Sequence, residues 1–179
     1  MSEIPEQQRR RMQFFYGQHA GEPDPEMMPR EGIDDSVLAG LATLDRASVT
    51  TGVGERNRVL FCEPGDTGMS LLHLWFKSNY VLPFHSHNVD CLYYVIGGEL
   101  HIGSRVMRTG DGFFVPAGQA YGYEAGPDGV EVLEFRNATR FNLRFGANDE
   151  ARWQRIADTY TERAHIWAEE TVPPSERGS

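Results

Sequence analysis

Short apolar segments separated by glycine- and proline-rich turns fill the middle of the chain, and this pattern constrains the fold most strongly. The segments are rich in β-branched and aromatic residues, as strands are. They run from 59 to 62, 69 to 76, 92 to 96, 113 to 115, 130 to 135 and 141 to 145. Turns such as Gly110-Asp111-Gly112 come at spacings typical of antiparallel sandwiches and barrels. Because no helical pattern interrupts the segments, the sequence predicts an all-β fold rather than a parallel α/β sheet.

The first 54 residues have a different pattern. Prolines alternate with acidic residues at positions 22–26, and such a segment cannot continue a helix. Further along, Asp34-Asp35-Ser36 can cap a short helix, which would place Val37, Leu38, Leu41 and Leu44 on one face. We therefore interpret residues 1–54 as an N-terminal arm with short helices, part of which packs against the rest of the protein.

The pattern changes again after residue 146. Apolar residues at helical spacing from Trp153 to Ala168 predict an amphipathic helix that Asn148 or Asp149 can cap, and Pro173-Pro174 ends it. The sequence thus predicts three regions: an arm over 1–54, a barrel over 55–146, and a C-terminal helix and tail over 147–179.

Size and charge narrow the class of function. The chain has 179 residues, which suits one domain, and its net charge of -9 argues against nucleic acid or an anionic membrane as partner. Two cysteines are too few for a disulfide framework, and neither a signal peptide nor an apolar run of about 20 residues is evident. We therefore expect a cytoplasmic protein without a membrane partner.

The sequence His85-Ser86-His87 is the most informative candidate site. In a strand, residues i and i+2 point to one face, so the two imidazoles could bind one metal ion. An isolated His-x-His is nevertheless weak evidence, because two histidines on a solvated strand face give the same pattern. The sequence around the motif has to decide between these readings.

Two segments downstream of the histidines, residues 91–100 and 110–121, complete a pattern that resembles the cupin superfamily. Its first motif is His-x-His, three or four residues, Glu, six residues, Gly, and its second is Gly, five residues, Pro-x-Gly, two residues, His. Here Gly98 lies seven positions after Cys91, and Pro116 lies six positions after Gly110. The resemblance implies a double-stranded β-helix, which is a jelly-roll barrel of two antiparallel sheets, with an interior metal bound by three His and one Glu.

The chain departs from this pattern at two of the four ligand positions, since Cys91 replaces the Glu and Tyr121 replaces the second-motif His. Three outcomes follow. The Cys91 thiolate could join His85 and His87, which would favour Zn or Fe. Alternatively, Asp90 could complete a two-His, one-carboxylate site as in non-haem Fe(II) oxygenases. In the third outcome, the barrel binds an organic ligand without metal.

Tyrosines would line the same interior. The resemblance places Tyr93 on the inner face with the histidines, and Tyr121 and Tyr123 share strand parity. Tyr121 is the candidate catalytic residue, which would orient or deprotonate the substrate. The sequence thus predicts a cupin enzyme with one divalent metal, Fe(II) or Zn, that acts on a small apolar or aromatic molecule as an oxygenase or a lyase or isomerase. The alternative is a metal-free binding or sensor cupin, and the resemblance favours a homodimer.

Overall fold

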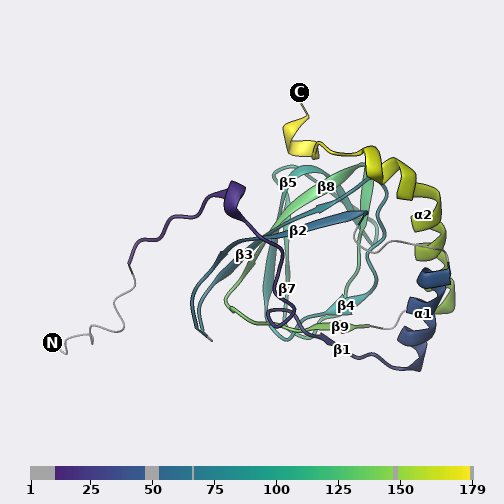
Figure 1. Ribbon diagram of the computed structural model, residues 1–179, viewed down its shortest axis with the longest axis horizontal. Helices are drawn as coiled ribbons and strands as arrows, with labels where there is room; N and C mark the ends of the chain where they lie inside the picture. The colour runs from purple at the N-terminus through teal and green to yellow at the C-terminus, as the bar shows by residue number, and fades with distance from the viewer. Residues whose placement is uncertain (1–10, 47–52, 66, 147–148, 178–179) are drawn as a thin grey trace.

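Two mainly antiparallel sheets face each other and enclose a barrel in the computed structural model, which describes residues 11–46, 53–65, 67–146 and 149–177 (Figure 1). The larger sheet has the order β2-β3-β8-β5-β6, and β7 also pairs with β5. Its strands are β2 (Glu55–Cys62), β3 (Ser70–Phe76), β5 (Cys91–Ile102), β6 (Arg105–Arg108), β7 (Gly112–Val115) and β8 (Glu124–Arg136). The smaller sheet has the order β1-β9-β4, with β1 (Arg30–Glu31), β4 (His85–Ser86) and β9 (Leu143–Phe145). The predicted all-β jelly-roll class is confirmed.

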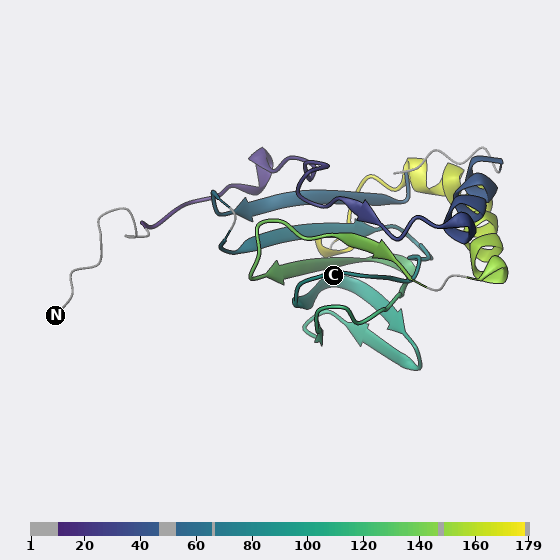
Figure 2. The same ribbon diagram turned by 90° about the horizontal axis from the view of Figure 1, so that it is seen from below.

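Strand β1 comes from the region that the sequence assigns to the arm. Arg30 and Glu31 pair in parallel with Leu143 and Arg144 of β9. The arm therefore completes the smaller sheet before it leads into the first helix. Residues 11–20 run away from the barrel at the end opposite to the helices, as Figure 2 shows, and include a short 3₁₀ turn at Gly17–His19.

Both predicted helices form where their caps predict. Helix α1 (Asp35–Arg46) begins after Asp34, whose Oδ1 accepts a hydrogen bond of 2.9 Å from the backbone N–H of Val37. Helix α2 (Glu150–Glu169) has Asp149 as its cap, and the other candidate, Asn148, lies outside the described residues. None of the helices in the described part of the chain is long and apolar enough to cross a membrane.

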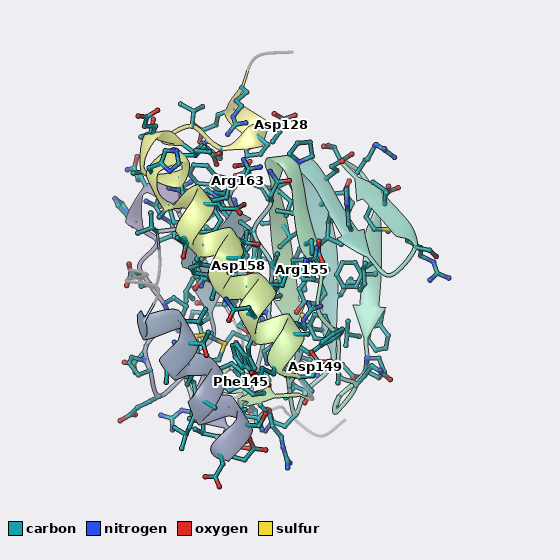
Figure 3. All side chains as sticks on the ribbon, turned by 90° about the vertical axis from the view of Figure 1, so that its right-hand side faces the viewer. Asp128, Phe145, Asp149, Arg155, Asp158 and Arg163 are labelled. Atoms are coloured by element: carbon teal, nitrogen blue, oxygen red, sulfur yellow. The ribbon has the colours of Figure 1, made fainter. Side chains whose placement is uncertain are left out.

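The two helices lie side by side against one side of the barrel (Figures 1 and 3). Helix α2 is fixed there by two polar contacts within a buried aromatic cluster. Trp167 Nε1 donates to Ser78 O at 2.8 Å, and the Tyr160 hydroxyl donates to the Tyr80 hydroxyl at 2.5 Å. The predicted amphipathic helix therefore packs its apolar side against the wall of the barrel.

Helices α1 and α2 approach each other closely at Gly40. A Cβ atom at this position would lie 2.2 Å from Trp153 Cδ2. We expect Gly40→Ala to lower the free energy of unfolding by about 1–2 kcal/mol, because overpacking costs more than the gain in helix propensity. Urea denaturation checks this result. Gly21→Ala is the control, since nothing lies within 4 Å of its added methyl group, and equal stability of the two variants would contradict the close packing.

The C-terminal segment is attached to the outer face of the larger sheet at a buried carboxylate. Glu131 accepts hydrogen bonds from the Ser175 backbone N–H at 2.7 Å and makes a 2.8 Å contact with His73 Nε2. Burial alone would raise the pKa of Glu131, but the contacts with His73 and Ser175 together bring it below its usual value. This carboxylate therefore stays charged and holds the short 3₁₀ turn Pro174–Glu176 against the barrel.

Candidate functional site

Side chains alternate between the two faces of a strand, and in this way the neighbouring strands β3, β8 and β5 place polar side chains inside the barrel. In β8, Glu134 and Arg136 face the interior together with the valines at 130 and 132. Arg136 lies opposite Ser70 of β3, and Glu134 lies opposite Leu72 of β3 and Tyr93 of β5. Residues directly opposite each other in a sheet share a face, and all five of these side chains are buried. The interior is therefore partly polar.

The two predicted histidines meet inside the barrel. His85 Nδ1 lies 2.9 Å from Pro83 O, and His87 Nδ1 lies 2.5 Å from Asn142 O. A carbonyl oxygen can only accept, so we assign the ring proton to Nδ1 in both residues. Each Nε2 is then an acceptor that faces the interior, and the two ring centroids are 5.0 Å apart.

Tyr121 joins this pair, as predicted. Its hydroxyl lies 3.0 Å from His85 Nε2 and in close contact with the hydroxyl of Tyr93. Burial, and then the charge of Glu134, raise the pKa of Tyr121 well above its usual value. Tyr121 is thus protonated at neutral pH and donates to His85 Nε2, so it enters a reaction as an acid rather than as a phenolate.

An arginine and a glutamate complete the site, and the sequence interpretation missed both. Arg136 Nη2 donates to Glu134 Oε2 at 2.5 Å and to His87 Nε2 at 3.3 Å. The guanidinium carbon lies 4.0 Å from the centroid of the Phe141 ring. Burial alone would lower the pKa of Arg136, but the Glu134 carboxylate raises it above its usual range. The Arg136 side chain therefore stays positively charged inside the barrel.

Burial of the two imidazoles and the nearby Arg136 cation both lower the pKa values of His85 and His87. Burial is the main cause that lowers the pKa of His85 to about 4. For His87, burial and then the nearby charge of Arg136 lower the pKa to about 3. Both imidazoles are therefore neutral at pH 7, and both Nε2 atoms can accept a proton or a hydrogen bond.

The residues present do not fit the metal site that the resemblance implies. Asp90, the carboxylate that the sequence offers as a third ligand, is exposed, and its Oδ1 accepts a hydrogen bond of 2.8 Å from the backbone N–H of Ala117. Burial, and then Glu134, raise the pKa of the Cys91 thiol to about 12, which opposes the thiolate that a metal needs. Within the described residues, no three His, Cys, Asp or Glu side chains are placed to hold a metal ion. Arg136 instead donates to the Nε2 atom of His87 that a metal would use.

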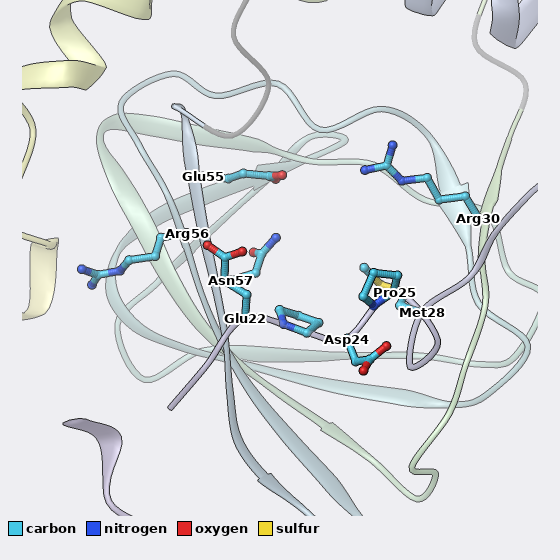
Figure 4. A pocket seen from close by; sticks show the side chains of 9 residues that line it. Glu22, Asp24, Pro25, Met28, Arg30, Glu55, Arg56 and Asn57 are labelled. Atoms are coloured by element: carbon cyan, nitrogen blue, oxygen red, sulfur yellow. The ribbon is translucent and has the colours of Figure 1, made fainter. Parts of the chain in front are cut away.

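A separate cavity of about 480 Å³ lies between the N-terminal arm and β2. Figure 4 shows Glu55, Asn57 and Arg30 pointing into the space that the strands surround, whereas Arg56 points away. Glu55 accepts a hydrogen bond of 3.0 Å from the Tyr80 hydroxyl, and burial raises the pKa of its carboxyl. In the sheet register, Glu55 lies opposite Phe76 and Asn57 lies opposite Leu74 of β3, so both share the inner face of the sheet.

No protein-family model matches this sequence, and no curated protein matches it either. Solved structures do match. The polyketide cyclase RemF from Streptomyces resistomycificus matches with a TM-score of 0.55 and 15% identity, over 85% of this chain and 97% of RemF.

Two further matches each cover about half of this chain. An RmlC-like cupin from Shewanella frigidimarina is 24% identical over 51% of this chain and 83% of its own, with a TM-score of 0.45. KdgF from Halomonas sp. is 21% identical over 49% of this chain and 83% of its own, with a TM-score of 0.43. At such identities the likeness concerns the fold and not the reaction.

Proposed function

This chain has the fold of the cupin superfamily, and we propose that it is an enzyme of the lyase or isomerase type that moves a proton of a small organic molecule inside the barrel. One observation carries the proposal. A neutral imidazole and a protonated phenol, His85 and Tyr121, are hydrogen-bonded at 3.0 Å in a buried site. A base next to an acid is what the transfer of a proton from carbon to oxygen requires.

The proposed step uses both groups. His85 Nε2 takes a proton from a carbon atom of the substrate, and the electron pair of that C–H bond moves toward the neighbouring carbonyl group. The carbonyl oxygen takes the hydroxyl proton of Tyr121. The hydrogen bond between the two residues then returns the proton from the imidazolium to the phenolate, while Arg136 and the Tyr93 hydroxyl stabilise the phenolate. An isomerase releases the enol or its isomer, and a lyase expels a leaving group from the neighbouring carbon.

Exchange of carbon-bound hydrogen tests this proposal directly. The protein is incubated in D₂O with a panel of small ketones and carboxylates, and proton NMR follows the loss of the C–H signals. Exchange well above the rate in buffer supports an enzyme. If no member of the panel exchanges but some bind, the alternative of a binding or sensor cupin is favoured.

Metal content tests the choice between a metal-dependent and a metal-free site. We expect protein purified without added metal, and then dialysed against Zn²⁺ or Fe²⁺ and washed, to hold far less than one equivalent by plasma mass spectrometry. The reason is that Arg136 donates to His87 Nε2 and that the pKa of the Cys91 thiol is raised. One equivalent of metal that disappears in both His85→Ala and His87→Ala would restore the metal-dependent enzyme that the sequence predicts.

A further inference from the structure

Besides Oδ1 of the half-buried Asn57, three almost fully buried polar side chains on the inner face have atoms without a hydrogen-bond partner in the described part of the chain. These atoms are Nε and Nη1 of Arg136, Oγ of Ser70 and the hydroxyl of Tyr123. The three residues are at most 2% exposed. Buried polar atoms in proteins are normally paired, so a group of unpaired ones requires an explanation.

Two of these residues are neighbours. Ser70 is directly opposite Arg136 in the pairing of β3 with β8. Tyr123 lies apart from them, because its ring packs edge to face on Phe76, further along β3 than Ser70, with centroids 5.5 Å apart. Arg136 Nη2 already donates to Glu134 and His87, which leaves Nε and Nη1 of Arg136 and Oγ of Ser70 as the unpaired atoms of this neighbouring pair.

All of these atoms can donate hydrogen bonds. Arg136 Nε carries one N–H group and Nη1 carries two, on different sides of the planar guanidinium, and the Ser70 hydroxyl adds one O–H group. A neutral carbonyl oxygen offers only two lone pairs to such a set, whereas a carboxylate offers about four acceptor sites. A phosphate dianion fits less well, because Glu134 lies on the same guanidinium and would repel a second charge.

We propose that Arg136 and Ser70 bind the carboxylate of the substrate, in place of the metal that the family motif implies. This inference rests on the proposed function, because it names the substrate class of the same site. Arg136 also contacts His87, whose ring lies 5.0 Å from that of His85. A carboxylate held here lies beside the proton-transferring pair, so the carbon next to it is the one that loses its proton.

Calorimetric titration with benzoate, acetate and benzamide tests the carboxylate site without any turnover. Benzamide has the shape of benzoate but lacks the charge and two of its acceptor sites. We expect the wild type to bind at least one carboxylate in the millimolar range or tighter, and benzamide at least tenfold more weakly than benzoate. The paired variant Arg136→Met with Glu134→Gln removes both charges together, and it should lose the preference for benzoate.

Ser70→Ala separates a ligand-binding role from a structural one. Its hydroxyl has no partner in the described part of the chain, so we expect the ligand-free variant to melt at the same temperature or higher, while carboxylate affinity falls about tenfold. Ser104→Ala, in the exposed turn between β5 and β6, is the matched control and should change neither property.

Two results would overturn the carboxylate site. One is that neither carboxylate binds in the millimolar range. The other is that Ser70→Ala lowers the melting temperature but leaves carboxylate affinity unchanged, which would mean that buried water satisfies the hydroxyl. Carboxylate binding without any hydrogen exchange would instead contradict only the proposed enzyme activity, so the two failures are distinguishable.

Discussion

Tyr121→Phe is expected to lower the rate of substrate C–H exchange by about 10²–10⁴-fold, which is the usual contribution of general acid–base catalysis. The variant removes the hydroxyl proton that Tyr121 donates to His85 Nε2 in the wild type. It keeps the ring and therefore its packing against His85, with centroids 4.5 Å apart. Substrate binding should change little, because the carboxylate is held by other residues.

The measurement is the initial exchange rate in D₂O at saturating substrate, with affinity measured separately by calorimetry. Tyr94→Phe is the control, because it removes a phenol hydroxyl from the exposed outer face of β5. If Tyr121→Phe exchanged hydrogen as fast as the wild type, Tyr121 would have no part in proton transfer. A loss of affinity alone would assign Tyr121 to binding.

Arg136→Met is expected to lower the free energy of unfolding by about 3–5 kcal/mol, because it leaves the buried Glu134 carboxylate without its cation. Both side chains are almost fully buried, at 1% and 5% exposure. Water therefore cannot compensate the remaining charge in the folded protein. The methionine fills most of the space of the arginine stem, so the loss comes mainly from the charge.

The double variant Arg136→Met with Glu134→Gln is the control for this effect. Replacing both charges of a buried pair is often nearly neutral, so it should recover most of the lost stability. Urea denaturation of the wild type, the two single variants and the double variant gives the coupling energy between the side chains. If the stability losses of the two single variants simply added up to that of the double variant, the coupling energy between Arg136 and Glu134 would be zero.

The barrel itself could be predicted from the sequence, because local patterns determine it. Alternating apolar segments and glycine-rich turns predict strands without knowledge of the partners. The His85-Ser86-His87 spacing likewise places two imidazoles on one face, and the structure brings their rings together. The resemblance added Tyr93 and Tyr121, which contact each other inside the barrel.

The chemistry of the interior could not be predicted, because it depends on contacts between distant strands. Glu134 lies in the segment 130–135, which the pattern predicts only as a strand, and Arg136 directly follows it, although two charges at i and i+2 beside apolar residues are a usable signal. Asp90 was one residue away from the inward-facing position of Cys91, and neighbours in a strand face opposite ways. The acid character of Tyr121 follows from burial, which no local pattern reveals. The homodimer and the cytoplasmic setting stay predictions.

Strand β8 carries buried carboxylates on its two faces, with Glu134 inside the barrel and Glu131 outside against the C-terminal segment. A slip of one residue during folding would move every side chain of this strand to the opposite face. Glu131 would then enter the barrel without a cation, and Arg136 and Glu134 would leave it together, which would take Arg136 away from His87. The charged residues of the barrel interior therefore raise the free energy of a chain in which β8 pairs in the wrong register. They help the chain to select a single native strand pairing.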